Sequence, residues 1–188
     1  MQTNLLWTGI EYYSLENCLI NTAGKNNHIN SSIIGYYQDK IYNVSYYIKT
    51  SSQWETYFLE LEYRINNEEH TIKLEKINDD WLFNKEKKET FKHCIDIDIS
   101  ITPFTNTLPI NRLQLRKGEQ SKINVIYINI FEHHVKPVHQ SYQCIAAGKF
   151  LYKNIPNDFE AEIEVDEAGF VINYPSLFKR TAIIEKNK

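Results

Sequence analysis

The sequence predicts an all-β protein built on a large antiparallel sheet, with few short helices. Apolar and polar residues alternate over many segments, turn-forming pairs recur at intervals of roughly a dozen residues, and few segments carry a helical period. Strict alternation buries one face of a strand, which is typical of antiparallel sheets. From the residues alone, a sandwich, a barrel and a roll are all compatible with this pattern.

The clearest strand is "EAEIEV", which sets Ala161, Ile163 and Val165 on one face and three glutamates on the other. The segments "NVSYYIK" and "WETYFLELEYRI" have the same period of two. The segment "KINVIYINIF" differs because both of its faces are largely apolar. It therefore predicts a strand that is covered on both sides and central to the fold.

Turn signals separate these runs, and one segment is a helix candidate. The turns are expected at Asn26-Asn27, Asn66-Asn67, Asn78-Asp79-Asp80, Asn157-Asp158 and Ala168-Gly169. The segment Asn84–His93 contains helix formers but little apolar face, so a charged loop is the alternative. Without repeats or linkers, residues 1–188 are predicted to form a single β-roll domain.

Composition excludes several partner classes. The chain has 188 residues, 42% of them hydrophobic and 24% charged, with a net charge of −3 and no Lys/Arg-rich block. Nucleic acid is therefore not an expected partner. No apolar run is long enough for a transmembrane segment, and the first residues do not resemble a signal peptide. Three widely spaced cysteines without C-x-x-C spacing predict reduced thiols. Together these features predict a cytoplasmic location, and we expect no bound cofactor.

The stretch "CIDIDISITPFTNTLPINRL" carries the most chemistry. Asp96 and Asp98 alternate with isoleucines, which places both carboxylates on one face of a strand, about 7 Å apart. They could be solvated, paired with Arg112 or a lysine, used to bind a polar ligand, or used as an acid and base on a glycosidic bond. The residues alone leave these alternatives open.

A stiff, apolar turn is predicted to follow these aspartates. Pro103 and Pro109 remove two N–H donors, so the segment cannot simply join a sheet ladder. Phe104 and Leu108 are then expected either to plug the core of the roll or to form the lip of a binding cavity.

Other catalytic and metal-binding patterns are weak. His133 and His134 are adjacent, so on a strand they point to opposite faces, and with His139 they predict a surface or edge strand instead of a metal site. The sequence contains neither a G-x-S-x-G nor an H-E-x-x-H motif.

The segment "DIDISITPFTNTLPINRL" resembles the signature of a bacterial family named putative glycolipid-binding. The matching positions are Asp96, Asp98, Thr102, Pro103, Phe104, Thr105, Asn106, Thr107, Leu108, Pro109, Ile110, Arg112 and Leu113. Further likeness lies at Trp7, Glu11, Trp54, Gln140, Tyr142 and in the closing "VDEAGFVINYPSLFKR", on Val165, Asp166, Gly169, Tyr174, Pro175, Leu177 and Arg180. Asn111 departs from the pattern, since the family has an arginine there.

This resemblance implies a strongly curved antiparallel sheet rolled into a half-open barrel or spiral, similar to periplasmic carriers that hold the acyl chains of lipoproteins. It implies that a glycolipid or another amphipathic small molecule binds on the concave face, with its tail in the hollow and its head near the rim. The candidate ligand-binding residues are Trp54, Asp96, Asp98, Phe104, Asn106, Leu108, Arg112, Tyr142 and Tyr174.

Two other functions remain open at this point. A hydrolase acting on a glycoside or lipid ester would use Asp96, Asp98 or Glu11 as paired carboxylates. An interaction module would pair through an open sheet edge. We assign no catalytic residue and no metal ligand.

Overall fold

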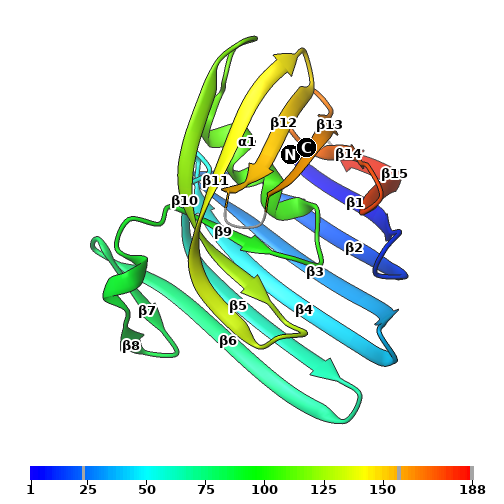
Figure 1. Ribbon diagram of the computed structural model, residues 1–188, viewed down its shortest axis with the longest axis vertical. Helices are drawn as coiled ribbons and strands as arrows, with labels where there is room; N and C mark the ends of the chain where they lie inside the picture. Colours follow the sequence, from blue (N-terminus) through cyan, green and yellow to red (C-terminus); the bar gives the residue numbers. More distant parts are fainter. Residues whose placement is uncertain (23, 156–157, 187–188) are drawn as a thin grey trace.

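The computed structural model describes residues 1–22, 24–155 and 158–186, and it confirms the all-β class (Figure 1). Fifteen strands form one curved sheet, which does not close into a barrel. The elements are β1 (Gln2–Gly9), β2 (Ser14–Asn21), β3 (Asn26–Tyr37), β4 (Lys40–Ser51), β5 (Thr56–Ile65), β6 (Glu68–Ile77), β7 (Asp80–Phe83), β8 (Glu86–Lys87), the 3-10 helix η1 (Glu89–Phe91), β9 (Asp96–Ile99), α1 (Phe104–Leu113), β10 (Gln120–Asn129), β11 (His134–Ala146), β12 (Lys149–Asn154), β13 (Phe159–Val165), β14 (Val171–Tyr174) and β15 (Phe178–Lys186).

The strand order places both ends of the chain in the middle of the sheet. From β8 the strands follow in reverse order to β1, which pairs with β15, and the order then runs back to β9. The first and last strands are antiparallel neighbours, with Gln2 opposite Lys186 (Figure 1). The two edges of the sheet, β8 and β9, come from the middle of the sequence.

The predicted alternation is confirmed in the strands. Leu59 and Leu61 of β5 have no exposed surface, while the glutamates between and beside them face outward or are partly covered. In β13, Ile163 and Val165 are buried in the same way. The turns at Asn66-Asn67 and Asn78-Asp79 connect hairpins as predicted. The turn predicted at Asn26-Asn27 is wrong, because those residues begin β3, and Asn157 lies outside the described residues.

Strand β10 is apolar on both faces because it separates two hydrophobic cores. Ile126, Ile128 and Ile130 pack with β1–β7 in the first core, whereas Ile123 and Val125 pack with β11–β15 in the second. The prediction that this strand is covered on both sides is therefore confirmed. In the order of the sheet it is nevertheless second from an edge, next to β9, with which it runs parallel.

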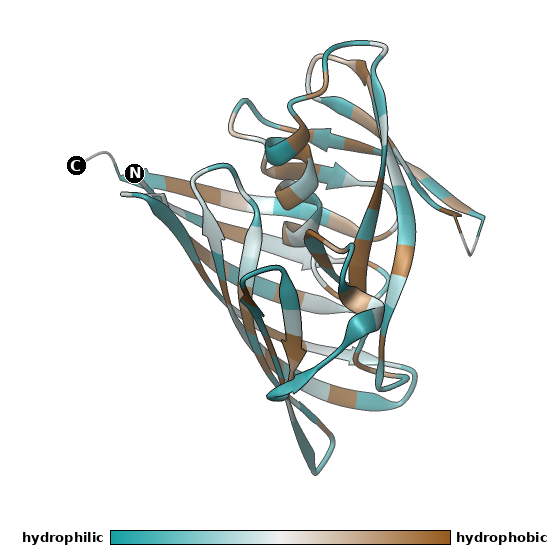
Figure 2. Cartoon of the chain, turned by 90° about the vertical axis from the view of Figure 1, so that its left-hand side faces the viewer, coloured by the Kyte–Doolittle hydropathy of each residue, from teal (hydrophilic) through white to brown (hydrophobic). Residues whose placement is uncertain are grey.

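The predicted stiff turn is wrong: residues 104–113 form helix α1, with Pro109 inside it. Threonine, asparagine and proline are poor helix formers, so their local preference does not explain the helix. All residues from Phe104 to Ile110 are buried, and this tertiary burial stabilises the helix instead. Figure 2 shows α1 in the space between the two halves of the curved sheet.

The helix predicted at Asn84–His93 is also wrong. That segment contains β8 and the single turn η1, of which Phe91 is the buried residue. Its many charged side chains leave too little apolar surface to hold a longer helix against the sheet. Within the described ranges, no helix is long and apolar enough to cross a membrane.

Candidate functional site

The first aspartate of strand β9 is held by an arginine of α1. Asp96 has no exposed surface, and the Arg112 side chain donates from Nε to Oδ1 (3.1 Å) and from Nη2 to Oδ2 (2.6 Å). Two parallel charge-assisted bonds of this kind fix both the position and the angle of the partners. The pair therefore attaches the C-terminal half of α1 to β9. The Asp96 carboxylate and the Arg112 guanidinium are each engaged in this ion pair.

The second aspartate has no such partner. Thr105 Oγ1 donates to Asp98 Oδ1 (3.2 Å) and Gln140 Nε2 donates to Oδ2 (2.5 Å). Burial raises the pKa of Asp98, and the hydrogen bonds from Gln140, Thr105 and Tyr152 counteract that rise only in part. No lysine, arginine or histidine of the described chain forms an ion pair with Asp98.

Asp98 faces a cavity of about 380 Å³, which we call the tyrosine pocket. It lies between the β1–β2 turn, β9, the start of α1, β10 and β12–β15. Its polar lining consists of Glu11, Asp98, Ser100, Thr102, Asn106 and Asn154. Its aromatic lining consists of Tyr12, Tyr127, Tyr152, Phe159, Tyr174 and Phe178, with Leu177 beside them.

Three of the rings form one wall of the pocket. The ring centroids of Tyr152, Phe159 and Tyr174 lie 6.1–6.4 Å from one another. Phe159 is 40% exposed and so marks the solvent side, whereas the two tyrosines are buried. Burial is the main cause that raises the pKa of Tyr152 and of Tyr174, and the Asp98 carboxylate is the second cause. Both hydroxyls therefore stay neutral at physiological pH.

Two asparagines differ in how their side chains are bonded. Asn106 Oδ1 accepts from the Tyr142 hydroxyl (2.9 Å), and Asn106 Nδ2 donates to the Pro103 carbonyl (3.4 Å). Asn154 is 6% exposed, yet its Oδ1 is buried and has no hydrogen-bond partner among the described residues. A buried acceptor without a donor is costly, and a ligand that supplies a donor would remove that cost.

The structure separates the residues predicted to bind a ligand. Asp98, Asn106 and Tyr174 line the tyrosine pocket. Phe104 and Leu108 have no exposed surface and belong to the first core, which is the plug alternative.

The remaining predicted ligand-binding residues contact other side chains of the protein. Trp54 packs edge-on against Phe170 at the first core (6.3 Å), and Tyr142 lies buried behind Asn106. Asp96 and Arg112 bind each other. Ligand binding by any of these residues stays a prediction.

A buried carboxyl group in the first core is not evident from motifs. Glu16 is 2% exposed, and the hydroxyls of Ser31 (2.7 Å), Tyr46 (2.7 Å) and Thr102 (2.9 Å) all donate to its Oε1. Its Oε2 is buried without a partner among the described residues. Burial raises the pKa of Glu16 to about 7. The available signal was the period of β2, in which Glu16 is in phase with the buried Cys18.

The histidine-rich segment lies at the surface but not at a sheet edge. His134 and His139 are exposed on β11, which pairs with β10 on one side and β12 on the other. The predicted surface location is thus observed, and the edge-strand alternative is wrong. His133 lies in the preceding turn, and its Nδ1 is hydrogen-bonded to the Tyr63 hydroxyl (3.0 Å).

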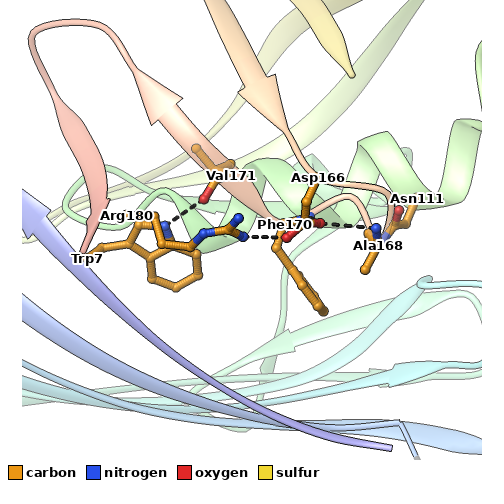
Figure 3. A network of polar contacts seen from close by, with 7 residues as sticks. All are labelled: Trp7, Asn111, Asp166, Ala168, Phe170, Val171 and Arg180. Carbon is orange, nitrogen blue, oxygen red and sulfur yellow. Dashed lines mark hydrogen bonds and ion pairs between the residues drawn. The ribbon is translucent and has the colours of Figure 1, made fainter. Parts of the chain in front are cut away.

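The β13–β14 turn is organised by one aspartate (Figure 3). Asp166 Oδ1 accepts from the backbone N–H groups of Ala168 (3.0 Å) and Phe170 (2.9 Å), and Arg180 pairs with Oδ2. The Arg180 and Asp166 positions of the family motif therefore shape a turn, which presents Phe170 to the first core.

Helix α1 and strand β1 are attached to the same segment (Figure 3). Asn111 Nδ2 donates to the Ala168 carbonyl (2.9 Å), and Trp7 Nε1 donates to the Val171 carbonyl (2.8 Å). Asn111, which replaces the family's arginine, thus connects the end of α1 to the turn. This network helps to fix the helix whose start lines the tyrosine pocket.

Replacing Gly169 with alanine is expected to lower the free energy of unfolding by about 2 kcal/mol. Gly169 has φ +78°, and an added Cβ would lie 2.0 Å from Asn111 Oδ1. The cost combines backbone strain with loss of the Asn111–Ala168 bond. Urea denaturation measures it, and Gly118→Ala, which has φ +89° but open space around it, is the matched control for strain alone. Equal losses in the two variants would contradict the steric contribution.

Comparison with known proteins gives one family and one solved structure. The family described as "Putative glycolipid-binding" matches residues 4–180. The crystal structure of a DUF1089 family protein from Pseudomonas aeruginosa is similar, with a TM-score of 0.77 and 27% identity, covering 88% of this chain and 92% of that one. No curated protein matches the chain. Because the family match spans nearly the whole sequence, the chain belongs to the family described as "Putative glycolipid-binding".

Proposed function

We propose that the tyrosine pocket binds the polar head group of a glycolipid or a related amphipathic molecule. The family description supports a glycolipid as the ligand class. The volume of about 380 Å³ falls within the range of roughly 300–1,000 Å³ of small-molecule sites. Aromatic walls with a few convergent polar groups are the usual construction of such sites.

The observation that carries the proposal is that Asn154 Oδ1 has no hydrogen-bond partner among the described residues. This oxygen is buried and belongs to a side chain that lines the pocket, so a ligand donor can reach it once the amide turns toward the pocket. A sugar hydroxyl is a suitable donor, and the neighbouring Asp98 and Asn106 can take further hydroxyls. The faces of Tyr152 and Tyr174 can pack against the C–H groups of a sugar ring.

The proposed orientation reverses the one predicted from the sequence. Phe104, Leu108 and Phe170 are buried in the first core. We therefore do not assign the tail of the ligand to the space that these side chains occupy. The head group instead occupies the polar interior of the tyrosine pocket. The tail then leaves past Phe159, which is 40% exposed at the mouth. Each methylene covered there adds up to ~0.8 kcal/mol.

Replacing Asn154 with alanine is expected to weaken head-group binding about tenfold, because one hydrogen bond to the ligand is lost. The measurement is an NMR titration of the ¹⁵N-labelled protein with n-octyl β-D-glucoside below its micelle concentration. Shifts are expected at Asp98, Asn106 and Asn154.

Asn30→Ala is the matched control, since Asn30 is exposed on β3 and does not line the pocket. The control is expected to bind like the wild type. Shifts confined to other surfaces, or equal affinity of the two variants, would overturn the proposal.

Hydrolysis remains a second candidate on one observation: Glu11 and Asp98 line the same pocket, the former exposed and the latter partly buried. Asp96, the other predicted carboxylate, has both oxygens occupied by Arg112. We favour binding, because both Asp98 oxygens already accept hydrogen bonds that hold them in place.

Two further proposals accompany this function. The described cysteines are free and buried, which supports a cytoplasmic location. The single continuous sheet supports one β-roll domain over residues 1–188.

A further inference from the structure

The tyrosine pocket is negatively charged. Glu11 and Asp98 are its charged lining residues, and none of the described residues that line it is a lysine, arginine or histidine. A phosphate, sulfate or carboxylate on the head group would meet like charge and find no cation to pair with. A neutral or positively charged head group is compatible with this lining.

Strand β9 carries two aspartates, so the surroundings of Asp98 can be compared with those of Asp96. Asp96 and Asp98 are two residues apart, and only Asp96 has a guanidinium partner. Asp98 is held by neutral donors, the side chains of Thr105, Gln140 and Tyr152. A buried carboxyl group is matched by a cation, as Asp96 is, or held by neutral donors with a raised pKa, as Glu16 is. No described residue supplies a cation to Asp98, and this partly exposed carboxylate lines the tyrosine pocket, where a ligand cation could meet it.

The aromatic wall next to Asp98 suits a cation as well. Tyr152, Phe159 and Tyr174 lie with their centroids 6.1–6.4 Å apart, so one small group can contact more than one ring. An ammonium group is attracted to the negative face of an aromatic ring, and more strongly where water is excluded. Asn154 Oδ1, which accepts no hydrogen bond from the part of the chain that the structure describes, adds an acceptor for one N–H bond of the ammonium group.

From these observations, and resting on the proposed function, we infer that the head group carries an amine. Its ammonium group binds between Asp98 and the aromatic wall and donates to Asn154 Oδ1. The ligand class is therefore an amino sugar joined to an apolar chain. The same charges disfavour an anionic glycolipid.

The experiment compares three probes that differ only at one sugar carbon: octyl glucoside, its 2-amino-2-deoxy analogue, and the N-acetylated form of that analogue. The N-acetyl form retains the nitrogen but removes the charge. Affinities are measured at neutral pH by calorimetry, with pocket binding verified by NMR shifts at Asp98 and Asn154. The amine is expected to bind about tenfold more tightly than either uncharged probe.

Asp98→Asn is expected to abolish this preference, so that the three probes bind alike. The matched control is Asp79→Asn, in the exposed β6–β7 turn, which should keep the preference. If Asp98→Asn fails to fold, Glu11→Gln provides a second test, because Glu11 is exposed and its loss is expected to reduce the preference in part.

The outcomes separate this inference from the function on which it rests. If the neutral probes bind in the pocket at least as tightly as the amine, the inference of an amine on the head group is wrong. The proposal that the pocket binds a head group is then unaffected. Binding of none of the three probes in the pocket overturns the head-group proposal itself.

Discussion

Replacing Arg112 with leucine is expected to lower the free energy of unfolding by about 3–5 kcal/mol. The guanidinium is the partner of Asp96, which has no exposed surface, so its removal leaves a buried carboxylate unmatched. Given total stabilities of roughly 5–15 kcal/mol, the loss is a large share. Equilibrium denaturation in urea at neutral pH measures it.

A double-mutant cycle distinguishes the buried charge from simple loss of side-chain packing. Adding Asp96→Asn to Arg112→Leu removes the stranded charge, and we expect the double variant to recover part of the loss. Arg64→Leu, at an exposed position of β5, is the matched control and should change stability by less than about 0.5 kcal/mol. A similar small effect for Arg112→Leu would show that Asp96 is not the charge that this arginine balances.

Replacing Glu16 with glutamine is expected to remove a pH dependence of stability worth about 3 kcal/mol. Burial raises the pKa of Glu16 from 4.5 to about 7 in the folded protein. Between these two values the folded state holds a proton that the unfolded state releases. Wild-type stability should therefore fall as the pH rises from 4.5 to 7, and the contribution of Glu16 is constant above that range.

Other buried carboxyl groups, among them Asp98, have a raised pKa and change the stability in the same direction. The quantity to compare is therefore the pH-dependent change in the wild type minus that in the variant. We would measure unfolding in urea at pH 5 and pH 8. Glu62→Gln, exposed on β5, serves as the matched control and should follow the wild type. An unaltered pH dependence in Glu16→Gln would mean that Glu16 is ionised in the folded state even at pH 5.

The strands were predictable because their signal is local. In β5 and β13 each side chain is placed by its own position in a period of two, and the sequence alone identifies which face is buried. The double-sided pattern of β10 likewise predicted a strand between two apolar layers.

Helix α1 was not predictable because its cause is not local. Half of its ten residues are threonine, asparagine or proline, which are poor helix formers, and the cores on either side of it make the helix favourable. Once the segment is a helix, Arg112 reaches Asp96, and Phe104 and Leu108 turn into the first core.

The candidate site was predicted in part for the same reason. The sequence points to Asp98 through its alternation with isoleucines and to Asn106 and Tyr174 through the family-like stretches, and all three line the tyrosine pocket. The difference between Asp96 and Asp98 depends on Gln140, which lies 42 residues away in sequence. Such long-range pairings carry no signature in a single sequence. Glu16 could have been noticed, since its phase in β2 placed it inside.

The pairing of β1 with β15 has a consequence for folding during synthesis. Strands β1–β8 form a continuous series of neighbours, so they can assemble as the first half of the chain leaves the ribosome. One backbone edge of β1 then has no partner until Phe178–Lys186 has been made. Pairings between residues so distant in sequence form slowly, and an open strand edge invites addition of another chain. During synthesis, the open edge most exposed to aggregation is therefore that of β1, although β1 lies in the middle of the finished sheet.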